Sequence, residues 1–267
     1  MLVVNADDFG FTHDVNRGII EAHTHGILTA TTLMANGIAF ADAVRLAREH
    51  PSLDVGCHFV LVGGESLAAP GKRLPATLPQ LLKAIALREI NPYVELKSQA
   101  QKIVDNIIRP LHLDTHKHTH LLPPVLHAVT RLSQEFGIPW VRRPFDFPLS
   151  GTGHVPWTKR ALSQSMQGLR NSFHRKLAKH QCRTTDYFAG FQITGSFRIR
   201  ELVALISALP EGTTELMTHP GFCGDELRAS PTRLKESRYE ELQALTSREV
   251  SQALSEHAVR LVRYGQL

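Results

Sequence analysis

The sequence predicts an α/β fold in which a mainly parallel sheet forms a TIM-barrel-like (β/α) barrel, regular or irregular. Short apolar, β-branched runs alternate with segments of helical periodicity along most of the 267 residues, and parallel neighbours need such crossover connections. The length suits one barrel-sized domain. Clusters of Asp and His follow several predicted strands, where barrels carry their active sites. Because we find no internal repeat or linker, we expect one domain over residues 1–267.

The first elements have clear hydrophobic patterns. Residues 2–6 are almost continuously apolar and predict a strand, and 15–25 have apolar residues at helical spacing and end before a glycine. Residues 29–35 read as a second strand and 39–49 as a second helix. Residues 55–60 read as a third strand.

The middle of the chain continues the alternation after an interruption. Residues 63–92 form a loop rich in Gly and Pro with one short helix. A helix at 93–108 leads to a strand at 112–118, and a helix at 124–136 is closed by a glycine. Residues 140–143 are the next predicted strand.

The last part contains the segment with the weakest pattern. Residues 150–183 start with turn-forming residues and continue as a basic helical stretch, which we interpret as an insertion or lid. A strand at 187–193, a helix at 199–209, a strand at 214–218 and a final helix at 248–257 complete the series.

Composition excludes several classes of protein. A hydrophobic content of 42% argues against disorder, and 30 Lys+Arg against 25 Asp+Glu give a formal charge of +5. The cysteines Cys57, Cys182 and Cys223 lack the spacing of a zinc module and are odd in number, which argues against a disulfide scaffold. No apolar run reaches the ~18 to 20 residues of a membrane span. We expect a cytoplasmic protein, with the basic charge allowing peripheral contact at the inner face of a membrane.

Acidic and imidazole side chains lie at the ends of the first and third predicted strands. Asp7 and Asp8 directly follow an apolar strand, where uncompensated buried charges are costly. They are interpreted either as a loop residue plus a helix cap, or as a metal ligand beside a general base. His58 lies near the end of its strand, and alone such a histidine is more often structural.

The segment HLDTHKHTH strengthens the functional interpretation. Asp114, His116, His118 and His120 share parity, so they project from one face if the strand persists. One residue type repeated at period two beside an acid is hard to explain by packing.

His219 ends another predicted apolar strand. The segment WVRRPF contains two adjacent arginines, whose side chains are expected to point to opposite faces of their strand. We expect one of Arg142 and Arg143 to point toward the site, pairing with Asp7 or a hydroxyl group of the substrate. Two imidazoles and one carboxylate form a facial set that leaves coordination positions open, as in catalytic metal sites. A divalent ion there would activate water for hydrolysis.

Other functions are compatible with the same barrel. A metal-dependent phosphoesterase or amidohydrolase is one alternative, although those commonly place a His-x-His pair on the first strand. A basic membrane- or nucleic-acid-binding module is another, but aromatic residues make up only 7% of the chain and base-reading motifs are missing. We therefore expect no nucleic-acid partner.

Taken in order, NADDFG, GCHF, LDTHKHTH and ELMTHPGF resemble the YdjC-like carbohydrate deacetylases, which include chitooligosaccharide deacetylases. The likeness extends to NRGIIEAHTHGILTATTLMANG and TRLKESRYEEL. It implies a TIM-barrel-like fold, one divalent metal ion and removal of an N-acetyl group from an amino sugar. The family is commonly assigned Mg²⁺, whereas imidazole ligands favour Zn²⁺ or a similar ion.

The resemblance also implies individual roles. The metal ligands fall on Asp8, His58 and His116, the general base on Asp7, and the acid that protonates the departing amine on His219. We expect that acid to be protonated before it acts. With three ligands already supplied, His118 and His120 are expected to support the site or contact substrate.

The closer likeness is to a branch associated with hopanoid biosynthesis, which implies an N-acetylglucosaminyl hopanoid as substrate. A chitooligosaccharide remains the alternative. Many relatives have a different pattern around Thr115 and Lys117, and the 150–183 segment has no match in the sugar-chain enzymes. A homodimer is also compatible with the sequence.

Overall fold

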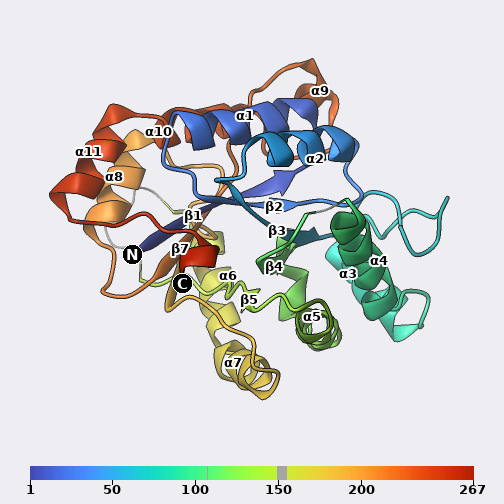
Figure 1. The fold of residues 1–267 in the computed structure, drawn as a ribbon. Coiled ribbons are helices and arrows are strands. Elements are labelled where there is room, and N and C mark those ends of the chain that lie inside the picture. The colour runs from blue at the N-terminus through green and yellow to red at the C-terminus, as the bar shows by residue number, and fades with distance from the viewer. Residues whose placement is uncertain (107, 149–154) are drawn as a thin grey trace.

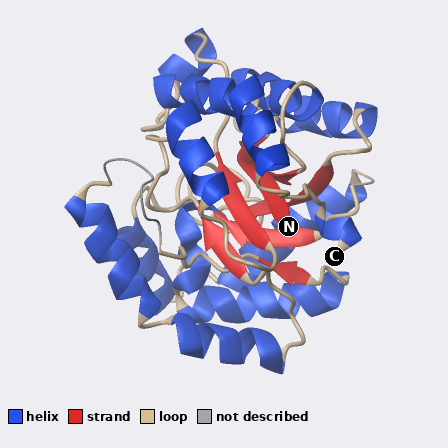
Figure 2. Cartoon of the chain, turned by 90° about the vertical axis from the view of Figure 1, so that its left-hand side faces the viewer, coloured by secondary structure: helices blue, strands red, loops and turns tan. Residues whose placement is uncertain are grey.

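The computed structural model describes residues 1–106, 108–148 and 155–267. In these residues seven strands form one sheet in the order β5-β4-β3-β2-β1-β7-β6, and every neighbouring pair is parallel. The strands are β1 (Leu2–Phe9), β2 (Ala30–Leu33), β3 (Asp54–Phe59), β4 (His112–Thr115), β5 (Trp140–Val141), β6 (Tyr187–Ala189) and β7 (Thr214–Thr218). Figure 2 shows them at the centre of the molecule, with helices around them.

Helices connect successive strands as far as β7, and further helices follow that strand (Figure 1). They are α1 (His13–Thr24), α2 (Phe40–Glu49), α3 (Leu78–Ala86), α4 (Pro92–Asp105), α5 (Pro123–Phe136), α6 (Trp157–Gln167), α7 (Arg170–Lys179), α8 (Ile199–Ser207), α9 (Asp225–Ala229), α10 (Glu236–Leu245) and α11 (Arg248–Glu256), with 3₁₀ turns η1 (His116–Leu121) and η2 (Tyr264–Gln266). Their ends follow capping rules: the Thr12 hydroxyl accepts the Val15 amide at 3.2 Å, and α5 ends at Gly137 with φ +66°.

The sheet curls into an irregular barrel, which confirms the predicted fold class. Between the edges formed by β5 and β6, the described residues form isolated bridges, Trp140 with Arg183 and Asp146 with Phe188. The interior strand β1 is buried along its whole length. The carboxyl ends of β1, β3, β4 and β7 therefore reach one end of the barrel from a rigid core.

The predicted fourth strand is too long. It ends at Thr115 rather than 118, because Lys117 and His118 adopt left-handed backbone conformations with φ of 56° and 51°. The Thr115 hydroxyl accepts the His120 amide at 3.0 Å and stabilises this turn. The expectation that residues 114, 116, 118 and 120 share one strand face is therefore wrong beyond Thr115.

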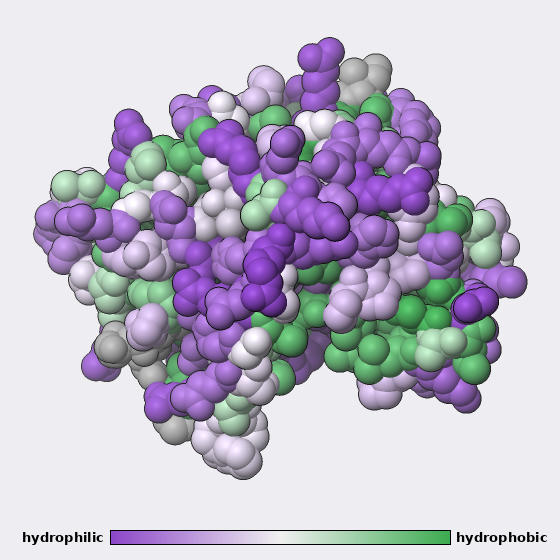
Figure 3. All heavy atoms as spheres, turned by 90° about the horizontal axis from the view of Figure 1, so that it is seen from below, coloured by the Kyte–Doolittle hydropathy of each residue, from purple (hydrophilic) through white to green (hydrophobic). Residues whose placement is uncertain are grey.

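The basic segment forms α6 and α7 on the outside of the barrel, while residues 150–154 of it lie outside the described part of the chain. Its function as an insertion or lid stays a prediction. Seen from below in Figure 3, hydrophilic residues gather over the middle of the face, and a hydrophobic area lies at its lower right. Among the described residues, no helix combines the length and the apolar character needed to cross a membrane.

Candidate active site

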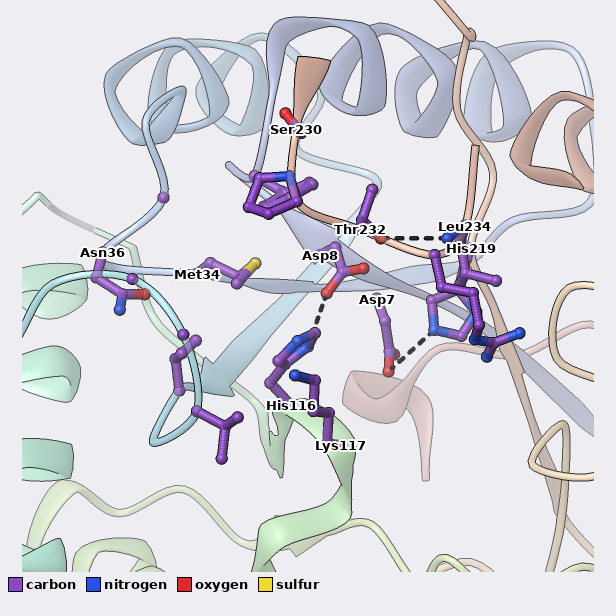
Figure 4. Close-up of a pocket in the computed structure, with 18 of the residues that line it drawn as sticks. Asp7, Asp8, Met34, Asn36, His116, Lys117, His219, Ser230, Thr232 and Leu234 are labelled. Carbon is purple, nitrogen blue, oxygen red and sulfur yellow. Dashed lines mark hydrogen bonds and ion pairs between the residues drawn. The ribbon is translucent and has the colours of Figure 1, made fainter. Parts of the chain in front are cut away.

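A cavity of about 610 Å³ opens at the carboxyl ends of the strands. Its lining includes Asp7, Asp8, His116, His118 and His219. Figure 4 shows Asp7 and Asp8 between His116 on one side and His219 on the other. Residues from β1, from the turn after β4 and from the end of β7 therefore meet in one place.

Asp8, His58 and His116 form a triangle of donor atoms. Asp8 Oδ1 lies 3.3 Å from His58 Nε2 and 3.2 Å from His116 Nδ1, and the two nitrogens lie 3.3 Å apart. Asp8 and His58 are buried, whereas the His116 side chain is 27% exposed toward the cavity. Asp8 Oδ1 is buried without a hydrogen-bond partner in the described residues. The three residues fit a divalent metal ion, which would supply the missing partner.

The backbone of β1 explains why two consecutive aspartates reach the same cavity. Neighbouring residues of a regular strand point to opposite faces. Here the pairing of β1 with β2 shifts between Ala6 and Phe9, and Asp8 has φ +70°. This bulge turns the Asp8 side chain toward Asp7. A left-handed conformation at a residue with a side chain costs roughly 1–3 kcal/mol, and such strain concentrates at functional sites.

The orientation of the His58 ring is fixed by the partners of its Nδ1 atom. Its Nδ1 lies 2.6 Å from Asp114 Oδ1 and 3.2 Å from the Thr32 hydroxyl, so Nε2 faces Asp8 and His116. A carboxylate behind a ligating imidazole is the usual second partner in metal sites. Although burial opposes it, Asp114 and Asp7 raise the pKa of His58 to about 10. The surroundings therefore favour a positive charge here.

Arg142 connects the carboxylates below the cavity. Its two Nη atoms bind Asp7 at 2.6 and 2.7 Å, Nη1 lies 2.5 Å from Asp114 Oδ2, and Nε binds Glu215 Oε1 at 2.6 Å. A second trio with metal-ligand spacing, Asp7, His58 and Asp114, is consequently neutralised by an arginine. Burial would raise the pKa of Asp7, but Arg142, His58 and His219 outweigh it and hold that pKa well below its ordinary value.

Asp8 also forms an ion pair with a buried arginine. Arg238 of α10 is buried, and its Nη2 lies 2.5 Å from Asp8 Oδ2, on the carboxylate oxygen that does not face the imidazoles. Burial opposes ionisation of Asp8, but Arg238, His116 and His58 outweigh it and hold its pKa well below the ordinary range. One oxygen of Asp8 is thereby held in place while the other stays free for a ligand.

His219 lies on the other side of Asp7. Its Nε2 is 4.0 Å from Asp7 Oδ2, and its backbone amide donates to Glu241 Oε2 at 2.6 Å. Burial lowers the pKa of His219 to about 4, against the opposing effect of Asp7 and Asp8. These surroundings favour the neutral imidazole, and the expected role of His219 as an acid stays a prediction.

His118 and His120 diverge after the end of β4. His118 lines the cavity and packs against Phe191, with ring centroids 5.6 Å apart. His120 is fully buried, and its ring nitrogens lie 2.6 Å from the Thr115 hydroxyl and 3.2 Å from the Arg142 carbonyl. Of these two histidines, only His118 is in a position to contact a molecule bound in the cavity.

The two arginines of WVRRPF separate in the same way. Arg142 lies beneath the cavity, whereas Arg143 donates to the Asp186 carbonyl and does not line the cavity. The structure therefore brings Arg142, but not Arg143, to Asp7.

Sequence reasoning missed Arg238 and Glu241, both of which belong to the TRLKESRYEEL segment. Their spacing of three residues on a helix usually marks an exposed ion pair. Instead both are buried and support different site residues, Asp8 and His219. The only available signal was the segment's part in the family likeness.

Known proteins resemble this chain along its whole length. A model of the family described as YdjC-like protein matches residues 1–256. The carbohydrate deacetylase of Brevibacillus brevis is 31% identical over 274 residues, covering 100% of this chain and 99% of that protein.

Two solved structures share the fold. One, from Enterococcus faecalis V583 and named for cellobiose-phosphate cleavage, superposes with a TM-score of 0.76 at 24% identity, covering 99% of this chain and 97% of the other. The lactam utilization protein of Thermus thermophilus gives a TM-score of 0.51 at 17% identity, with coverages of 99% and 100%. At these identities the likeness concerns the fold alone.

Proposed function

Because the chain belongs to the YdjC-like family, we propose that it is a metal-dependent hydrolase that removes the N-acetyl group from an N-acetylglucosamine-containing carbohydrate. The observation that carries this proposal is the donor triangle of Asp8, His58 and His116 beside Asp7, which lines the same cavity. An Asp and two His ligands leave positions open for water and for a substrate carbonyl.

The ion would be held by Asp8, His58 and His116. When bound, a divalent ion at such a site polarises the substrate carbonyl and lowers the pKa of water. The two imidazole donors favour Zn²⁺ or a similar transition ion over Mg²⁺, which prefers oxygen ligands.

Asp7 is the proposed general base. Its low pKa keeps it ionised, and Arg142 holds both of its oxygens in place. Asp7 accepts a proton from water at Oδ2, the oxygen that faces His219, as the water oxygen bonds to the acetamide carbon.

His219 is the proposed proton carrier to the leaving group. Because it starts neutral, the proton accepted by Asp7 is passed to His219 Nε2 and from there to the amine nitrogen as the carbon–nitrogen bond breaks. A free amine and acetic acid leave, the acid releases its proton to solvent to give acetate, and Asp7 and His219 return to their initial states. Glu241 supports this exchange by fixing the His219 backbone.

We further propose a sugar linked to a lipid, such as an N-acetylglucosaminyl hopanoid, presented at the inner face of a membrane. An apolar wall of the cavity supports this choice. Phe11, Met34, Val60 and Val62 line it, and Ile38, whose residue surface is 74% exposed, lies at the same cavity. A free chitooligosaccharide offers this wall only its acetyl methyl groups and the C–H faces of its rings, whereas a lipid offers a larger apolar surface.

An acetate-release assay tests the proposal. Purified protein is given N-acetylglucosamine, a chitin disaccharide or an N-acetylglucosaminyl lipid, with and without a chelator. We expect acetate from the lipid-linked substrate, abolished by the chelator. Release from the disaccharide alone would overturn the lipid assignment, and chelator-insensitive release or none at all would overturn the proposed function.

Variants assign the roles separately. His116→Ala should lose both metal and turnover, whereas the exposed His257→Ala should retain both. Asp7→Asn and His219→Ala should retain metal and lose on the order of 10² to 10⁴ in rate. Elemental analysis of each purified variant provides the metal content, and a His116→Ala protein with full metal occupancy would contradict the ligand assignment.

A further inference from the structure

A second cavity, of about 670 Å³, lies on the outer side of the barrel near the incomplete seam between β5 and β6. Its walls come from the chain after β5, from α6 and the start of α7, and from β6 and the chain after it. It shares no lining residue with the candidate active site. Arg143, Arg160 and Arg170 line it, and we name it the outer arginine pocket.

Arg143 is the buried member of this set. Its exposed fraction is only 6%, and its Nε is buried without a hydrogen-bond partner in the described residues. One Nη donates to the Asp186 carbonyl, which holds the guanidinium in the wall. A buried guanidinium nitrogen without an acceptor is costly, and a ligand oxygen would satisfy it.

The positive charge of the pocket is not neutralised by ion pairs. In the part of the chain that the structure describes, none of Arg143, Arg160 and Arg170 has a carboxylate within ion-pair distance. Burial and then Arg170 lower the pKa of Arg143 to about 10, and His174 has a pKa lowered by burial and by both arginines. Cationic groups have therefore been brought together at an energetic cost.

The nearest carboxylates are used elsewhere. Asp146 lines the pocket, but its two oxygens accept the backbone amides of Phe191 at 3.1 Å and Gln192 at 2.8 Å. The Asp186 carboxylate accepts the Thr213 amide at 2.8 Å. In the described residues neither carboxylate forms an ion pair with the three arginines, and Asp186 offsets only part of the lowering of the Arg143 pKa.

We propose that the outer arginine pocket binds a phosphate group. Guanidinium groups present planar pairs of donors that match phosphate oxygens, and several arginines around one cavity are the usual arrangement for this ligand. Polar side chains of Gln164, Gln167 and Tyr187 on the same walls supply further hydrogen-bonding groups. The inference goes beyond the proposed deacetylation and does not depend on it.

Two sources of phosphate are to be distinguished, a small phosphate ester and the headgroup of an anionic lipid. Helix α6, which carries Arg160, also exposes apolar side chains, with Trp157 at 78% and Leu162 at 52% exposure. Aromatic and basic residues together are typical of contacts with an anionic membrane surface.

Titration calorimetry with inorganic phosphate tests the pocket. We expect saturable binding by the wild-type protein that Arg170→Met weakens at least tenfold, as the loss of one charge-assisted contact predicts. Arg170 is exposed, so this variant is expected to fold. Arg143→Lys, which keeps the charge but not the planar donors, should weaken binding as well.

Two matched controls separate the pocket from general basicity and from the active-site cavity. Arg175→Met removes an exposed charge from the same helix, and Arg73→Met removes a cation from the active-site cavity. Both should bind phosphate like the wild type. No binding by the wild type, or equal loss in Arg170→Met and either control, would overturn the proposal.

Vesicle sedimentation identifies the source. Phosphatidylcholine vesicles with and without phosphatidic acid are mixed with wild-type and Arg170→Met protein. Binding that requires phosphatidic acid and Arg170 supports a lipid headgroup. Saturable binding of inorganic phosphate without vesicle binding supports a small phosphate ester.

Discussion

Replacing Arg142 by methionine tests the charge network beneath the candidate active site. The side chain is buried and contacts the carboxylates of Asp7, Asp114 and Glu215 at 2.5 to 2.7 Å. Methionine retains much of the apolar volume but removes the cation that all three share. Removing one partner of a single buried ion pair typically costs about 3–5 kcal/mol.

That cost is large against a total stability of about 5–15 kcal/mol. At about 2–4 °C per kcal/mol for a domain of this size, the melting temperature should fall by about 6–20 °C at pH 7. Arg45→Met is the matched control, because Arg45 also pairs with two carboxylates, Asp42 and Glu49, but on the exposed surface of α2. Exposed pairs contribute little, so the control should melt close to the wild type.

The loss of stability in Arg142→Met should also depend on pH in a defined direction. In the wild type Asp7 has a lowered pKa, so it contributes stability that is present above its unfolded value of about 3.9. Without Arg142, burial raises the folded-state pKa of Asp7, and stability is lost as pH rises through that value. The melting temperature of Arg142→Met should therefore lie further below that of the wild type at pH 7 than at pH 5. An equal deficit at both values, or no deficit, would refute this account of the network.

Two further predictions concern metal affinity and backbone packing. Asp114→Asn removes the negative charge that contacts His58 Nδ1, and it should weaken metal binding about 10- to 100-fold. Calorimetry measures this affinity, and an unchanged metal affinity would contradict a positioning role for Asp114. Gly18→Ala should destabilise by about 1–3 kcal/mol, because its Cβ would lie 2.4 Å from the Gly221 Cα. Gly168→Ala, where the nearest atom would lie at 3.4 Å, is the control in the same denaturation series, and equal stability of the two variants would exclude the clash.

Much of the architecture could be predicted from local patterns. The alternation of apolar runs with helical segments indicated the parallel sheet, since each run buries a strand and each crossover needs a helix. Asp8, His58 and His219 were selected because they lie at or near the ends of predicted strands, and the carboxyl ends of parallel strands meet at one end of a barrel. Their proximity therefore depends on topology that the sequence reveals.

Other features depend on contacts between distant segments. Period-two spacing assigned four residues of LDTHKHTH to one face, but the chain turns after Thr115 and sends His116 and His120 in different directions. Likewise, nothing local distinguished Arg142 from Arg143, and only the structure shows which of them faces Asp7.

The sequence by itself determined the order of strands and helices and the kind of chemistry at the strand ends, because both follow from side-chain type and spacing along the chain. Tertiary structure alone decided the charge state and orientation of that chemistry. Arg238 and Glu241, more than two hundred residues from the first strand, are folded against Asp8 and His219. Burial strengthens charge interactions between such groups, so the properties of each site residue depend on neighbours that no local pattern identifies.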